Sequence, residues 1–113
     1  LSNALKLVFS ENAESVLFIA TSNLSRLSRA PEAKQESETY LELIKNMDTG
    51  GLIKAYEEKS IRPCGIIPVT ALLSFLPEKT KIKLIGVKES RETLMDKEKT
   101  IVYGAMNCFN GKQ

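Results

Sequence analysis

The spacing of the apolar residues changes near residue 65, and this change constrains the fold more than any other feature. Before that point, apolar side chains recur at steps of three and four residues, which is the period of an amphipathic helix. After it, residues 81–88 alternate between apolar and mostly charged side chains, which is typical of a half-buried strand. The sequence therefore predicts an α+β fold, with helices mainly in the N-terminal half packed on a small, mostly antiparallel sheet formed by the C-terminal half.

The N-terminal part carries the longest helical stripe. Its members are Leu5, Phe9, Ala13, Val16, Ala20, Leu24 and Leu27. Two layouts fit this stripe: a single helix from about Asn3, or a short strand over residues 5–9 followed by a helix that Ser10 caps. Acidic residues directly after Ser10 favour the second layout, because carboxylates stabilise the first turn of a helix. Pro31 is expected to end the segment, since a residue before proline is disfavoured in the helical region.

Two further helices are expected before residue 60. Residues 32–47 begin with acidic side chains and carry an apolar stripe, and Gly50 and Gly51 would close this helix with left-handed backbone geometry. Residues 52–59 predict a shorter helix with Ile53 and Tyr56 facing inward.

The C-terminal half is predicted to contain the sheet. Residues 81–88 and 100–109 should pair antiparallel, with a bulge at Gly104. The short apolar run after Pro68 fits either a helix or a strand, because periodicity does not separate the two over so few residues. Since two strands alone are only marginally stable, residues 5–9 or 66–73 are expected to add a third.

Length and composition predict one globular domain over residues 5–113, with residues 1–4 resembling an expression scar. The chain has 113 residues, of which 42% are apolar and 27% charged, as in ordinary folded proteins. Its longest apolar run, residues 16–20, is far shorter than a membrane span. We expect a cytoplasmic protein with no membrane contact, and export stays open because a removed leader would leave no trace.

The sequence contains no histidine, and this absence excludes much catalytic chemistry. Catalytic triads and dyads that use imidazole as the base cannot form, and most catalytic zinc sites also need an imidazole. Gly50 and Gly51 match neither the spacing of a phosphate-binding loop nor that of a dinucleotide-binding loop. We therefore predict no catalytic residue, no metal site and no cofactor.

Cys64 and Cys108 can form one disulfide or remain two thiols, and the tendency of free cysteine to be buried favours thiols. Cys64 is the best candidate for a reactive side chain, because Arg62 lies two residues before it and a cation lowers a thiol pKa. A cysteine nucleophile also needs a partnered base, and the sequence supplies no candidate for that role.

Charge is distributed unevenly along the chain. Residues 1–60 have seven basic and nine acidic side chains, whereas residues 61–113 have nine and five, which gives the overall net charge of +2. Lys81 and Lys83 should lie on one exposed strand face, with Lys99 leading into the partner strand and Tyr103 nearby. Such a face can contact phosphate and stack on bases, although lysines also protect sheet edges from aggregation. Arg26 and Arg29, one helical turn apart, can hold an anionic partner or stabilise a helix C-terminus.

Together these features predict a non-enzymatic binding module that contacts another protein or further copies of itself. Adaptors, inhibitors and immunity-type proteins of bacterial systems fit this description, as does a domain of a larger protein. The alternative is a histidine-free RNA-binding or RNA-cleaving domain of toxin type, using Lys81, Lys83, Lys99 and Tyr103. The small net charge makes nucleic acid the weaker option, because phosphate contacts dominate such binding.

Overall fold

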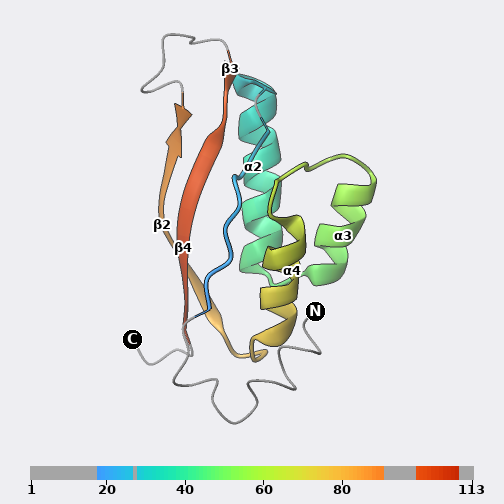
Figure 1. The fold of residues 1–113 in the computed structure, drawn as a ribbon, viewed down its shortest axis with the longest axis vertical. Coiled ribbons are helices and arrows are strands. Elements are labelled where there is room, and N and C mark those ends of the chain that lie inside the picture. The colour runs from blue at the N-terminus through green and yellow to red at the C-terminus, as the bar shows by residue number, and fades with distance from the viewer. Residues whose placement is uncertain (1–17, 27, 91–98, 110–113) are drawn as a thin grey trace.

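The structure is a computed structural model that describes residues 18–26, 28–90 and 99–109 (Figure 1). Over these ranges the chain forms three helices followed mainly by strands, which confirms the predicted α+β class. The elements are β1 (Ser28–Arg29), α2 (Ala30–Lys45), α3 (Thr49–Glu57), α4 (Ile66–Phe75), β2 (Lys81–Glu89), β3 (Lys99–Thr100) and β4 (Val102–Phe109). None of the described helices is long and apolar enough to cross a membrane.

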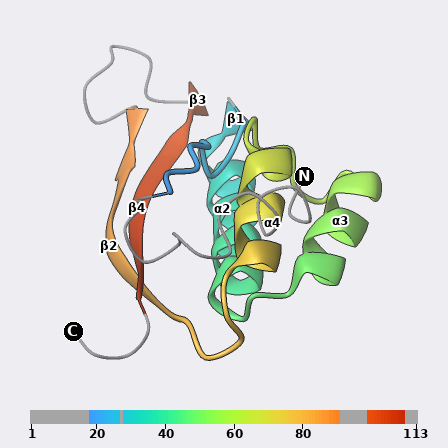
Figure 2. The same ribbon diagram turned by 60° about the horizontal axis from the view of Figure 1, so that its bottom comes forward.

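The long strands form a two-stranded ribbon, and the helices cover one side of it. Helix α2 runs along the ribbon and contacts both β2 and β4, whereas α3 lies farther out against α2 and α4 (Figure 2). The core forms between these layers. Its large, deeply buried apolar side chains include Leu24, Tyr40, Leu52, Ile61 and Val102.

Helix α2 confirms the helix predicted over residues 32–47, with a shifted start. Ala33, Tyr40 and Ile44 are buried at helical spacing, so one stripe of α2 faces the core. Pro31 was expected to end the preceding segment and instead lies in the first turn of α2. Proline is tolerated there because the first backbone N–H groups of a helix have no partner within the helix.

The segment before α2 departs from the prediction. The helix expected up to Pro31 is wrong over residues 18–26, which are irregular, while residues 5–9 and Ser10 lie outside the described ranges. Near its end this segment is bonded to β4 instead. The Leu24 N–H donates to the Val102 carbonyl over 2.8 Å, and the Val102 N–H donates to the Ser25 hydroxyl over 3.0 Å. Pairing with a strand satisfies these backbone groups without a helix.

The link between α2 and α3 also differs from the prediction. Helix α2 ends at Lys45, and Met47 rather than a glycine adopts the left-handed backbone with φ of 52°. Gly50 and Gly51 lie inside α3, where the Gly51 N–H donates to the Asp48 carboxylate over 2.9 Å. Asp48 therefore caps α3, and the two glycines belong to the start of this helix rather than to the end of α2.

The inward side of α3 was also predicted incorrectly. Leu52 is fully buried and Ala55 packs against the core, so these two residues define the inward stripe. Ile53 and Tyr56 each follow one of them by one residue, about 100° around the helix, and are 49% and 46% exposed. The apolar run after Pro68 belongs to a helix, α4, and therefore adds no strand to the sheet.

Strands β2 and β4 pair antiparallel, as predicted. The irregularity in their register lies in β2 between Leu84 and Gly86, and not at Gly104. Gly104 serves a different purpose, because a Cβ atom there would come within 2.6 Å of a Leu24 methyl carbon. The strand predicted over 100–109 is divided into β3 and β4, and β3 pairs with β1 in a separate short sheet.

Candidate functional site

The side of the β2–β4 ribbon that faces away from α2, which we name the outward face, carries several charged strand residues. Alternation defines its members, because Ile82 and Met106 pack against the core and successive side chains point to opposite sides. The described members are Lys81, Lys83, Lys88, Tyr103, Ala105, Asn107 and Phe109.

The register of the strands sets which of these side chains are neighbours. Lys88 lies opposite Tyr103, and Lys83 lies opposite Asn107. Side chains directly opposite each other in an antiparallel pair have Cβ atoms about 5 Å apart, so the side chains of Lys88 and Tyr103 start from neighbouring positions on this face. The three lysines are exposed and Tyr103 is 48% exposed. The outward face is thus a basic surface with an accessible aromatic ring.

Lys99 does not join this surface. It lies in β3, where its Cα partner is Arg29 of β1. The structure therefore brings together two cations that the sequence assigned to separate regions, and separates Lys99 from Lys81, Lys83 and Tyr103, with which it was grouped.

Arg26 and Arg29 are not one turn apart on a helix, because residue 26 is irregular and Arg29 is in β1. Arg26 lies 3.9 Å from the Glu36 carboxylate, which is almost fully buried. Glu36 also accepts a hydrogen bond of 2.7 Å from the Arg62 backbone N–H and one of 3.4 Å from the Arg26 backbone N–H. Glu36 therefore joins two separate loops to α2.

A second cluster forms where residues 21–23 meet the turn that contains Cys64, and we name it the loop junction. The Cys64 N–H donates to the Asn23 side-chain oxygen over 3.0 Å, and the Asn23 N–H donates to the Cys64 sulfur over 3.4 Å. The Gly65 N–H donates to the Ser22 hydroxyl, also over 3.0 Å. These bonds connect parts of the chain more than 40 residues apart.

Tyr40 of α2 lies beneath the loop junction. Its hydroxyl donates to the Ser22 hydroxyl over 3.3 Å, and its ring is fully buried. Burial raises the pKa of Tyr40, the hydrogen bond with Ser22 opposes this rise, and the charge of an ionised Cys64 adds to it. The hydroxyl therefore stays protonated at neutral pH and acts as a hydrogen-bond donor.

The contacts of the loop junction stabilise the fold and do not form a catalytic set. The Cys64 thiol is exposed, and its partners named above are backbone and side-chain amides, which do not act as a general base. Cys108 is a second free thiol on β4, and burial raises its pKa. In the part of the chain that the structure describes, no group of three or more acidic or cysteine residues could hold a metal ion.

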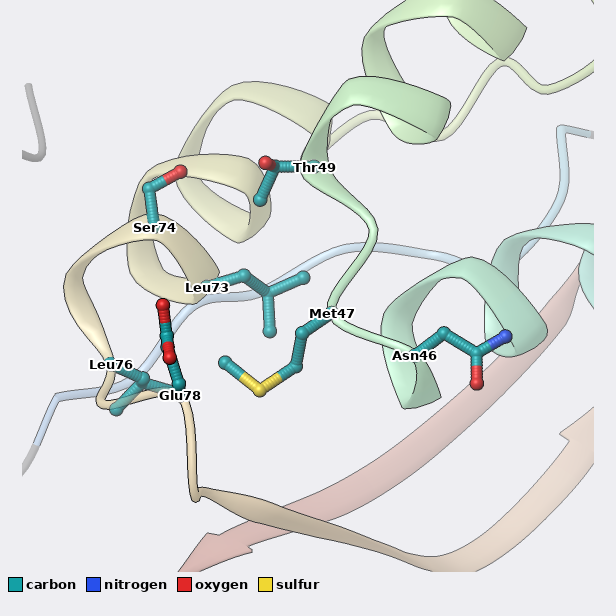
Figure 3. Close-up of a pocket in the computed structure, with 7 residues that line it drawn as sticks. All are labelled: Asn46, Met47, Thr49, Leu73, Ser74, Leu76 and Glu78. Atoms are coloured by element: carbon teal, nitrogen blue, oxygen red, sulfur yellow. The ribbon is translucent and has the colours of Figure 1, made fainter.

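A shallow hollow of about 330 Å³ lies where the ends of α2 and α4 meet the start of α3 (Figure 3). Leu73 and Met47 lie in the middle of the lining residues, with Thr49, Ser74 and Glu78 around them (Figure 3). The lining has no lysine, arginine or cysteine, and the ionisable side chain in it is Glu78.

The fold and these clusters define a small α+β domain with one basic sheet face and a structural loop junction. Residues 1–107 match the model of the family described as Memo-like protein, so the chain belongs to this family. No curated protein and no solved structure gives a significant match to the chain.

The sequence reasoning missed Ser22, Asn23, Glu36 and Tyr40 as contributors to a cluster. Glu36 had a detectable signal, because it lies three residues after Ala33 and four before Tyr40, on the buried stripe of α2. Ser22 and Asn23 gave no signal, since their partners lie more than 40 residues away in the chain.

Proposed function

We propose that this Memo-like domain is a binding module that holds an acidic segment of a partner protein on its outward face. The observation that carries the proposal is that Lys81, Lys83 and Lys88 lie on one exposed side of a ribbon whose other side is fixed by the core. Lysines i and i+2 on a strand are about 7 Å apart, so their positive potentials add. A carboxylate-rich segment complements this surface.

RNA is the second candidate occupant of the same face, and the pairing of Lys88 with Tyr103 favours it. An aromatic ring next to a cation is the arrangement on which single-stranded bases stack. We rank it second, because the net charge of the chain is only +2 and the aromatic content of 6% is low.

The experiment compares two labelled probes by fluorescence anisotropy. One is a nine-residue peptide that alternates glutamate with valine or threonine, and the other is a single-stranded uridine oligonucleotide. The double variant Lys81→Glu/Lys83→Glu reverses two charges on the outward face. The matched control, Lys34→Glu/Lys54→Glu, reverses two exposed lysines on α2 and α3 and leaves the same net charge.

We expect the first variant to weaken peptide binding about tenfold or more, since each exposed charge pair contributes up to about 1 kcal/mol and reversal adds repulsion. The control variant should bind within about twofold of the unmodified chain. Equal losses of peptide affinity in both variants would show that binding depends on net charge and not on the outward face. Binding of the RNA probe alone, lost in the first variant, would favour the second candidate.

A further inference from the structure

We infer that the partner segment binds as an added strand along the outer edge of β2, and this inference rests on the proposed function. In both views of the ribbon, β4 lies between β2 and residues 18–26, and β2 is the outermost strand (Figures 1 and 2). Over the described ranges β2 pairs with β4 and with no other strand. Among the described strands, none occupies the outer edge of β2, and an extended chain can pair there.

The two edges of the ribbon differ. The outer edge of β4 is occupied at its start, because Val102 exchanges hydrogen bonds with Leu24 and Ser25. Along β2, alternate residues direct their N–H and C=O groups away from β4, as in any strand with one neighbour. Over residues 81–84 the pairing with β4 is regular, so this stretch presents an uninterrupted edge.

Side chains along residues 81–84 specify which segment fits. Lys81 and Lys83 project on the outward face, whereas Ile82 and Leu84 lie on the inner side and are partly buried. An added strand alternates in the same way, so its residues beside the lysines must be acidic and the residues between them apolar. The structure thus favours a segment of four or five residues in which acidic and apolar side chains alternate.

The register irregularity after Leu84 is a bulge at Ile85, and it provides an apolar contact at the end of this stretch. Ile85 has no cross-strand partner in the register and is 67% exposed, and Val87 is 40% exposed. Bulges shorten the regular edge of a strand and limit unspecific pairing. A partner segment that continues past Leu84 can cover Ile85 with an apolar side chain and remove that surface from water.

A second copy of the chain does not satisfy these requirements. Pairing two β2 edges would place Lys81, Lys83 and Lys88 of both copies on the same side of one sheet, next to each other. Like charges on neighbouring strands destabilise a sheet. The lysines therefore act against self-association and select an acidic strand from another protein.

The experiment uses the alternating acidic peptide in three forms. One form is unmodified, a second is N-methylated at every glutamate, and a third is N-methylated at every apolar residue. Only one of these two sets directs its N–H groups toward β2 in an added strand, because N–H direction alternates along a strand. We expect one methylated form to bind about tenfold or more weakly and the other to bind within about threefold of the unmodified peptide.

Hydrogen exchange of the β2 backbone amides is measured on the same complex. An added strand should slow exchange at alternate residues of 81–84 by about tenfold or more. If the unmodified peptide binds but both methylated forms bind equally well and the β2 amides exchange unchanged, strand addition is wrong and binding by the outward face stands. If the peptide does not bind, the proposed function fails as well. Sedimentation that shows dimers dissociated by the peptide would contradict the argument against self-pairing.

Discussion

Gly65 is buried at the N-terminus of α4 and lies against the backbone of residues 21–22, so Gly65→Ala tests the loop junction directly. A Cβ atom on Gly65 would overlap the Thr21 carbonyl oxygen and would lie 2.5 Å from the Ser22 Cβ. The φ of Gly65 is −107°, which other residues adopt readily, so the cost of the substitution is steric. Gly86 is the matched control, because a Cβ there meets nothing within 4 Å.

The magnitude follows from two contributions. Inserting a methyl group into a packed site costs about 1–3 kcal/mol, because backbone must shift. A shift of residues 21–23 also weakens the hydrogen bonds from Cys64 to Asn23 and from Gly65 to Ser22, each contributing roughly 0.5–1.5 kcal/mol. We expect the Gly65→Ala variant to lose about 2–6 kcal/mol of unfolding free energy, and Gly86→Ala to change it by less than about 0.5 kcal/mol.

Urea denaturation followed by circular dichroism measures both variants against the unmodified chain, with equal slopes required for the comparison. A Gly65→Ala variant that unfolds within about 0.5 kcal/mol of the unmodified chain would refute the close approach at the loop junction. An equal loss in Gly86→Ala would show that the chain is sensitive to any glycine substitution, and would refute the steric argument as well.

Three further predictions concern side chains around the loop junction. Burial raises the folded-state pKa of Tyr40, so the stability that its protonated hydroxyl contributes is complete below the ordinary pKa near 10 and is lost as pH rises through the folded-state pKa. Tyr40→Phe should therefore reduce the fall in unfolding free energy at alkaline pH. A fall as steep as that of the unmodified chain would contradict this prediction. Iodoacetamide should modify the exposed Cys64 faster than Cys108, whose pKa is raised. Mass spectrometry of peptides after timed quenching measures both modification rates, and faster modification of Cys108 would contradict the prediction. Glu36→Ala should cost about 1.5–3 kcal/mol in urea denaturation, because the Arg62 N–H loses a charged acceptor, and a loss below about 0.5 kcal/mol would contradict the bridging role.

The sequence predicted elements whose patterns were local. Residues 81–88 alternate, and the strand formed with the expected partner and direction. The apolar stripe of residues 32–47 produced α2 and its buried Tyr40. Both results depend on one face of a single element being apolar, which is a property that a short window of sequence contains.

Other elements depended on neighbours that no local pattern reveals. Leu24 has helical spacing to its apolar neighbours, but its backbone pairs with Val102 of β4, 78 residues later in the sequence. Met47 adopts a left-handed backbone that glycine normally supplies, so the glycine pair at residues 50–51 predicted a C-terminus for α2 that is too late in the sequence. Tertiary contacts decided both cases.

The candidate site could be predicted only where it depends on local patterns. Lys81, Lys83 and Tyr103 could be placed on one face because alternation and antiparallel pairing suffice to do so. Lys99 could not be separated from them, because the break at Ile101 that divides β3 from β4 has no marker in the sequence.

The most direct test of the account is a map of backbone amide chemical shifts during titration with the alternating acidic peptide. We predict that the largest changes fall on residues 81–88 of β2 and on Tyr103 and Ala105 of β4, and that α3 and α4 change little. Changes centred on the loop junction at Cys64, or on the exposed side of α3 at Ile53 and Tyr56, would contradict binding by the outward face.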